Sequence, residues 1–107
     1  MGRMTFQLTV LYLQPDDPAA FDAYYEATHA PLAVKIPGLR GYTAMHPAPG
    51  PDGSAPAEYL VATLLFDDEA SLAEGLGSAE GDAAARDIRN FATGGATMLT
   101  GEVTTYV

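Results

Sequence analysis

Apolar and polar residues alternate along the first stretch of the chain, from Met4 to Leu13. One side of this stretch is entirely apolar and consists of Met4, Phe6, Leu8, Val10 and Tyr12. The other side is polar at its start and apolar at its end, with Thr5, Gln7, Thr9, Leu11 and Leu13. A period of two, with β-branched and aromatic residues, predicts a strand whose apolar side lies in the core.

The spacing then changes to that of a helix. Asp17 suits an N-cap and Pro18 the first helical residue, because the carboxylate accepts a free backbone N–H and proline has none to leave unpaired. Apolar residues and tyrosines recur every three or four positions, at Phe21, Tyr24, Tyr25, Thr28 and Leu32. Pro31 is expected to kink or end this helix near Ala30. Residues 32–38 have room for one further turn.

The rest of the pattern predicts two strands, two helices and a last strand. The strands are residues 39–46, residues 58–66 and residues 97–107, of which 58–66 is the most apolar and hence central. Asp67 or Asp68 is expected to cap a helix at 69–77, and Ser78 another at 79–92. Residues 47–57 are rich in proline and glycine, which is typical of a long hairpin loop. Their composition fits a lid over a pocket as well as a disordered loop.

The order β-α-β-β-α-β predicts an α+β, ferredoxin-like fold, with helices on one face of a four-stranded antiparallel sheet. We expect residues 1–107 to form a single domain. The second face of this sheet is too apolar to be exposed to water. Cover is needed for Leu11 and Leu13, and for either Leu60 and Phe66 or Tyr59 and Val61. This predicts a symmetric homodimer, sheet facing sheet, with a cavity between the protomers.

The composition narrows the range of partners. The formal net charge is −9, and the five basic residues are scattered, so nucleic acid and anionic membrane surfaces are poor partners. The chain has no cysteine and no apolar run long enough to span a membrane, and we expect a cytoplasmic protein. The acidic pairs Asp16-Asp17 and Asp67-Asp68 are expected to be helix caps, with no metal site.

One stretch resembles a known family. Tyr25-Glu26-Ala27-Thr28-His29-Ala30-Pro31-Leu32, followed by Ile36-Pro37-Gly38-Leu39-Arg40-Gly41-Tyr42, resembles the EthD family of the dimeric α/β-barrel superfamily. The resemblance implies a ferredoxin-like protomer, a dimer whose sheets form a barrel-like core, and a ligand pocket between the sheet and the first helix. The family is named for an accessory role in ether degradation. Some fungal members resemble dehydratases or decarboxylases that act on aromatic polyketides.

His29 is the leading candidate for chemistry. A histidine titrates near neutral pH, which suits a general acid or base, and Tyr25 lies four residues earlier on the same helical side. The end of a helix favours the charged imidazole. We expect Pro31 to end the helix and so leave His29 at the mouth of a cavity. The alternative is a structural role, in which His29 caps the last carbonyls of the interrupted helix.

Other residues could bind a substrate. Tyr24, Tyr42 and Tyr59 could line a pocket with their hydroxyls, although tyrosines are commonly packing residues with an exposed tip. His46, near a strand end, could share a face with Tyr42, or it could be a surface histidine. Arg40, and less so Lys35, could bind a carboxylate or a phenolate.

These residues predict a small enzyme that acts on an apolar or aromatic metabolite without a cofactor. The chemistry would be of the acid–base kind, as in a dehydratase, decarboxylase, isomerase or cyclase, with His29 and Tyr25 catalytic and Tyr42, Tyr24, His46 and Arg40 binding substrate. One alternative is a non-catalytic binding protein that serves a pathway enzyme. The superfamily also contains cofactor-free monooxygenases and heme-dependent enzymes. The sequence therefore leaves an oxygenase or a heme protein as further alternatives.

Overall fold

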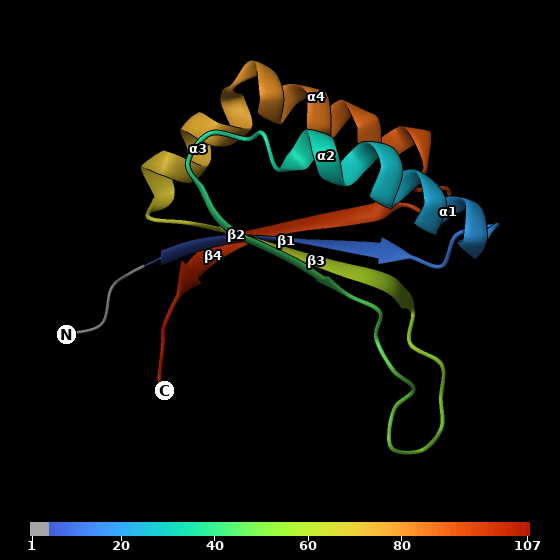
Figure 1. Ribbon diagram of the computed structural model, residues 1–107. Helices are drawn as coiled ribbons and strands as arrows, with labels where there is room; N and C mark the ends of the chain where they lie inside the picture. Colours follow the sequence, from blue (N-terminus) through green and yellow to red (C-terminus); the bar gives the residue numbers. More distant parts are fainter. Residues whose placement is uncertain (1–4) are drawn as a thin grey trace.

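A four-stranded antiparallel sheet carries helices on one face in the computed structural model, which describes residues 5–107 (Figure 1). The strands are β1 (Thr5–Leu13), β2 (Leu39–Met45), β3 (Glu58–Phe66) and β4 (Ala96–Val103). They lie in the order β2-β3-β1-β4, which confirms the predicted ferredoxin-like arrangement and the central place of β3. The predicted first strand also included Met4, which lies outside the described residues.

The helical layer has two parts. The first consists of α1 (Pro18–Tyr24), the π-helical turn η1 (Tyr25–His29) and α2 (Ala30–Ala33). The second consists of α3 (Glu69–Gly77), α4 (Ala79–Asp87) and the 3₁₀ turn η2 (Ile88–Asn90). Asp17, Asp68 and Ser78 accept backbone N–H bonds as N-caps, as predicted. None of the helices in residues 5–107 has the length and apolar character needed to cross a bilayer.

Pro31 was expected to kink or end the first helix, and the expectation that the helix ends there was wrong. The backbone widens to a π-helical turn just before the proline, and the N–H of Ala30 bonds the carbonyl of Tyr25, five residues back. The helix then continues to Ala33. Because proline has no N–H and its ring clashes with the carbonyl four residues earlier, an unaltered α-helix would be disrupted here. The wider turn accommodates the proline without breaking the helix.

The π turn also changes which side chains face the sheet. The buried residues of this segment are spaced by four, at Phe21, Tyr25, His29 and Ala33. Thr28, which we predicted to lie on the buried stripe, is exposed. One extra residue per turn moves the stripe by one position, so His29 takes the place expected for Thr28.

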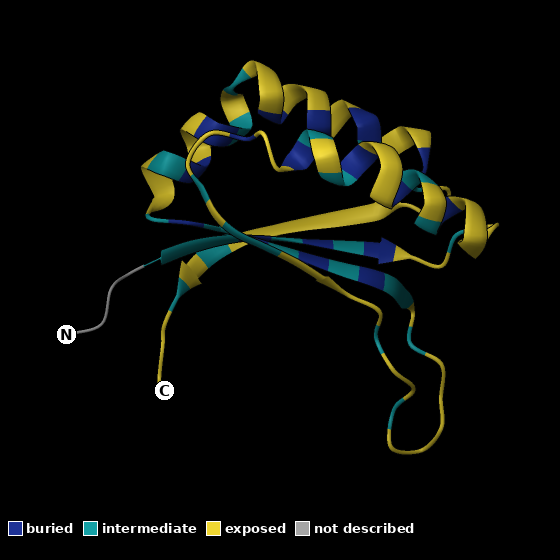
Figure 2. Ribbon diagram, in the orientation of Figure 1, coloured by how far each residue is buried: buried dark blue, intermediate teal, exposed yellow. Residues whose placement is uncertain are grey.

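The core lies between the helices and one face of the sheet (Figure 2). Of the two pairs that the sequence left open, Leu60 and Phe66 lie beneath the helices and are at most 4% exposed. The ring of Tyr12 lies at the centre of an aromatic cluster, 5.5 to 5.9 Å from the rings of Phe21, Tyr25 and Phe91. The contacts with Phe21 and Tyr25 are edge-on, and contacts of this kind stabilise a core beyond the area they bury. They also hold the first helix against β1 and against Phe91, the residue that follows η2.

The other face of the sheet has no helix over it (Figure 1). Leu11 on β1 pairs with Val61 on β3, which in turn pairs with Met45 on β2. Leu99 on the edge strand β4 is 54% exposed, and Met45 is 57% exposed. These residues form an apolar face, which we call the open face. Tyr59, named as an alternative to Leu60, instead reaches α1, where its hydroxyl donates to the carboxylate of Asp22.

The loop at residues 47–57 extends beyond the sheet, away from the helices (Figure 1). None of its residues lines the pockets described below. The loop therefore projects from the protomer. It contacts none of the pockets, so the structure does not support the interpretation of this loop as a lid.

Two glycines in the helical layer permit a direct test of the packing. A Cβ atom on Gly81 would lie 2.1 Å from the carbonyl oxygen of Gly75, whereas a Cβ on Gly77 would meet nothing within 4 Å. Gly81→Ala is expected to lower the free energy of unfolding by about 1–3 kcal/mol through overpacking between α3 and α4. Gly77→Ala, the matched control, is expected to be neutral or stabilising by up to ~1 kcal/mol. Urea unfolding measures both changes, and equal effects would contradict this account.

Candidate functional site

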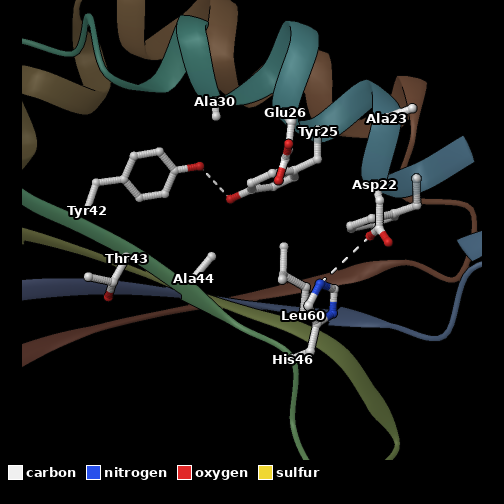
Figure 3. Close-up of a pocket in the computed structure, with 11 residues that line it drawn as sticks. Asp22, Ala23, Tyr25, Glu26, Ala30, Tyr42, Thr43, Ala44, His46 and Leu60 are labelled. Atoms are coloured by element: carbon white, nitrogen blue, oxygen red, sulfur yellow. Dashed lines mark hydrogen bonds and ion pairs between the residues drawn. The ribbon is translucent and has the colours of Figure 1, made fainter. Parts of the chain in front are cut away.

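A pocket of about 630 Å³ lies between the first helix and β2, and we call it the outer pocket (Figure 3). Tyr25 and Tyr42 stand on one side of it, and Asp22 and His46 on the other. The carboxylate of Glu26 hangs from η1 between them. Its floor is apolar, formed by Ala44 and Leu60. This hollow lies where the resemblance implied a ligand pocket, between the sheet and the first helix.

A second, smaller space of about 100 Å³ lies deeper between the sheet and the helices, and we call it the inner cavity. Apolar side chains of β1, β3 and α4 line most of it, among them Val10, Leu64 and Ala84. His29 lines the inner cavity and does not line the outer pocket. Tyr25 and Tyr42 line both spaces, so their side chains form the wall between them.

His29 is only 5% exposed, so our expectation that it lies at a cavity mouth was wrong. The helix that was expected to end at Pro31 continues, and the imidazole points into the core. Its Nδ1 lies 3.0 Å from a carboxylate oxygen of Asp87 on α4. Among the hydrogen bonds of the described residues, none joins the imidazole to a helix carbonyl, which removes the capping alternative.

Asp87 holds the polar groups of this region together. One of its oxygens accepts the Tyr24 hydroxyl at 2.5 Å and the Asn90 amide at 3.0 Å, while the other faces His29. Burial alone raises the pKa of Asp87, but these hydrogen bonds outweigh it, and the pKa lies below its usual value. The carboxylate is therefore ionised at neutral pH although only 7% of the residue is exposed.

The partner of Nδ1 decides the state of the imidazole. Because an ionised carboxylate only accepts hydrogen bonds, Nδ1 carries the proton and Nε2 has the free lone pair. Burial lowers the pKa of His29 below 6.5, and the hydrogen bond and charge of Asp87 offset only part of this effect. Our expectation that a helix end favours the charged imidazole was wrong, because the desolvation of His29 dominates.

Tyr25 and Tyr42 are joined by a hydrogen bond between their hydroxyls (Figure 3). Burial is the main cause that raises the pKa of both phenols, so both are neutral at physiological pH. The ring of Tyr25 also lies 5.2 Å from the ring of His29. The structure thus brings together His29, Tyr25 and Tyr42, three of the residues that the sequence singled out.

The remaining predicted residues lie in different surroundings. Tyr24 bonds Asp87 and does not line the outer pocket. His46 lines the pocket, with Nε2 3.8 Å from Asp22 and its ring 4.8 Å from the ring of Tyr59. Arg40 is exposed and forms an ion pair with Asp67 at 3.0 Å, outside the pocket. The structure does not support a substrate-binding role for Arg40, because its side chain is exposed and lines neither the outer pocket nor the inner cavity near His29.

Sequence reasoning missed Asp87. A signal was present, because Asp87 lies three residues after Ala84 and four before Phe91, on the side of the predicted helix that faces the core. An acidic residue on a buried face needs a partner. The sequence did not show that the partners would be Tyr24 and His29, some sixty residues away in the chain.

The geometry does not fit a heme group. His29 is the residue that would bind the iron, yet the space beside it is about 100 Å³, far smaller than a macrocycle needs. Within residues 5–107, no three histidine or acidic side chains come together as a metal site would require.

Comparison with known proteins assigns the chain to a family. The model of the EthD domain matches residues 14–95. The chain belongs to the EthD family. It is 40% identical over 94 residues to an uncharacterized 11.0 kDa protein of Rhodococcus erythropolis from the thcB-thcC intergenic region, covering 88% of this chain and 90% of that one. An EthD family protein of Bacillus halodurans has 38% identity and a TM-score of 0.87, over 94% of this chain and 99% of that one.

More distant solved structures share the fold alone. SnoaB of Streptomyces nogalater, described as a cofactor-independent oxygenase, has a TM-score of 0.64 at 15% identity, over 99% of this chain and 96% of its own. A protein of Thermobifida fusca, described as dimeric and ferredoxin-like, has a TM-score of 0.68 at 13% identity, over 94% of this chain and 92% of its own.

The state of His29 can be measured directly. We expect the imidazole resonances of His29 to titrate with a midpoint below 6.5, because burial disfavours the charged ring. Asp87→Asn is expected to move this midpoint further down, since the carboxylate is the group that favours protonation. NMR titration of both proteins checks this. A midpoint above 6.5, or an upward movement in the variant, would contradict the assigned arrangement.

The same shift predicts how stability depends on pH. The unfolded chain binds a proton at His29 near pH 6.5, and the folded chain binds it only at lower pH. Between these values the unfolded state holds more protons, so the free energy of unfolding falls as the pH drops below about 6.5. His29→Gln should flatten this dependence in that window. Urea unfolding between pH 5 and pH 8 measures it, and an unchanged slope in the variant would count against the prediction.

Proposed function

We propose that this EthD protein is a small enzyme that binds an apolar or aromatic metabolite and transfers a proton with His29. The observation that carries the proposal is the buried pair of His29 and Asp87 beside a cavity. An imidazole whose second nitrogen is held by a carboxylate is a common arrangement for a general base. The reaction class is of the dehydratase, decarboxylase, isomerase or cyclase type, because these reactions need proton transfer and no electron carrier.

The surroundings of His29 support the role of each group. Nε2 has the lone pair that would take a proton from carbon or oxygen, and the charge of Asp87 would stabilise the imidazolium that forms. Tyr25 and Tyr42 are neutral hydroxyl groups, which can donate to an oxyanion that develops on the substrate. Asp87 acts through His29 and is therefore a positioning residue.

Deuterium exchange on an enolisable aromatic ketone tests proton transfer without knowledge of the natural substrate. The probe is 4-hydroxypropiophenone in D₂O, and NMR follows exchange at the carbon next to the carbonyl. His29→Gln keeps a side chain that can donate to Asp87 but cannot act as a base, and it should lower the exchange rate by roughly 10²-fold or more. Arg86→Gln, an exposed substitution on α4, is the control and should exchange as the unchanged protein does.

The outcome also separates the enzyme from its main alternative. If the unchanged protein and His29→Gln bind the ketone equally and neither exchanges it, the protein is a ligand-binding accessory protein and acid–base catalysis is wrong. A loss of exchange with unchanged folding, checked by circular dichroism, supports the role of His29 as a base.

A cofactor-free monooxygenase is a second candidate. It is favoured by the fold shared with SnoaB and by an apolar cavity beside a neutral base, where an ionised substrate could react with dioxygen. Oxygen consumption with an oxidisable phenol, measured by an oxygen electrode, distinguishes this activity from proton transfer alone.

We also propose that the protein is a homodimer joined through the open face of the sheet. The exposed apolar side chains Met45 and Leu99 and the half-buried Leu11 and Val61 favour such an interface. The dimeric ferredoxin-like protein of Thermobifida fusca has the same fold.

A charge on the open face tests the dimer. Val61→Glu is expected to shift the protein from dimer to monomer, because the interface would bury an unpaired carboxylate. Ala83→Glu adds the same charge on the exposed side of α4 and should leave the dimer intact. Light scattering after size exclusion gives both masses. A monomeric unchanged protein, or a dimer of Val61→Glu as stable as the control, would refute this interface.

A further inference from the structure

The two cavities form one site with two compartments. The outer pocket and the inner cavity share Tyr25 and Tyr42, whose bonded hydroxyls stand at one end of the outer pocket (Figure 3). The base of the proposed reaction, His29, lines only the inner compartment. A molecule that reaches the imidazole from the outer pocket must therefore pass the two tyrosines and place part of itself in the inner cavity.

The inner cavity accepts a small apolar group. Its volume of about 100 Å³ has room for about three groups of the size of a water molecule. Most of its lining is apolar, as with Leu8, Leu64 and Ile88. The carboxylate of Asp87 is not part of this lining, because its hydrogen bonds direct it to Tyr24, Asn90 and His29.

His29, which lines this cavity, has one polar atom left for a ligand. Nε2 of His29 makes no hydrogen bond to the described residues, although the side chain is more than nine-tenths buried. Among the described residues, every side-chain nitrogen or oxygen that is fully covered has a hydrogen-bond partner. Because Nε2 has no such partner, it must keep some accessible surface. A group in the inner cavity would therefore lie against the residue that carries an available lone pair.

The outer pocket selects against anions. Asp22 and Glu26 line it, and no lysine or arginine of the described residues does. A carboxylate on the ligand would meet like charges, whereas a neutral hydroxyl could donate to Asp22. Asp22 already accepts the Tyr59 hydroxyl and stands near His46, at the end of the pocket away from Tyr25 and Tyr42.

We propose that the substrate is an uncharged, elongated molecule with a hydroxyl at the Asp22 end and an apolar group of about three carbons in the inner cavity. This inference rests on the proposed function and names the class of substrate for the same site. It places the reacting atom near the junction of the two compartments, where the bonded hydroxyls of Tyr25 and Tyr42 stand and the ring of Tyr25 lies 5.2 Å from the ring of His29.

A series of 4-alkylphenols tests the proposal by isothermal titration calorimetry. The Kd is expected to fall about fourfold for each carbon from methyl to propyl, as each buried methylene leaves water, and to stop falling once the cavity is full. 4-Propylbenzoate, which is an anion of similar shape, should bind at least tenfold more weakly than 4-propylphenol. The double variant Asp22→Asn, Glu26→Gln should reduce this difference.

Filling the inner cavity provides the matched variant. Ala84→Leu adds a side chain into the cavity and should abolish the dependence on chain length, with binding of 4-methylphenol nearly unchanged. Ala83→Leu makes the same change on the exposed side of α4 and should keep the dependence. If Ala84→Leu does not fold, crystals of the unchanged protein under xenon serve instead. Xenon should bind beside Ala84 and be displaced by 4-propylphenol, but not by 4-methylphenol.

The outcomes separate this inference from the proposed function. If alkyl length has no effect, or if the benzoate binds as well as the phenol, the two-compartment substrate is wrong even where ketone exchange by His29 persists. If no phenol of the series binds and no exchange occurs, both proposals fail. A fourfold step per carbon that Ala84→Leu removes and Ala83→Leu keeps supports the inference.

Discussion

The missing N–H of Pro31 is the constraint on which the arrangement of this site depends. It is accommodated by a π-helical turn at Tyr25–His29, and the helix continues instead of ending. The extra residue in that turn aligns Phe21, Tyr25, His29 and Ala33 on the buried side. A regular helix would have turned Thr28 towards the core and His29 further round. The histidine is thus carried into the layer between helix and sheet by a local backbone requirement.

Burial of an imidazole needs a partner, and Asp87 supplies it from the second half of the chain. The carboxylate is itself buried and stays ionised because Tyr24, Asn90 and His29 all face it. This network ties the first helix to α4 and sets the tautomer of His29. The structural role of these groups and the chemical role that we propose for His29 therefore involve the same atoms. The hydrogen bonds that stabilise the buried charge of Asp87 also leave Nε2 of His29 free.

The helices and strands could be predicted from local patterns, because each is determined by residues that are close together in the chain. The alternation in β1 and β3, the caps at Asp17, Asp68 and Ser78, and the order of strands and helices all depend on near neighbours in the chain. His29, Tyr25 and Tyr42 could be named because they lie in a stretch that resembles the EthD family. The same reasoning failed at Pro31. The missing N–H of proline can be accommodated either by the end of the helix or by a π-helical turn. Packing against the sheet selects between these two outcomes, and local patterns do not show it.

Local patterns along the chain were enough to predict the ferredoxin-like order of elements, the apolar character of both faces of the sheet, and the stretch that holds the candidate histidine. Packing of the helices on the sheet, by contrast, buries His29, makes Asp87 its partner and leaves Arg40 exposed beside Asp67. It also decided that Tyr25 and Tyr42 separate two cavities. The reason is physical: helix and strand periods are set by residues a few positions apart. The partner of a buried charge, by contrast, is set by chain segments that meet only when the sheet and helices pack.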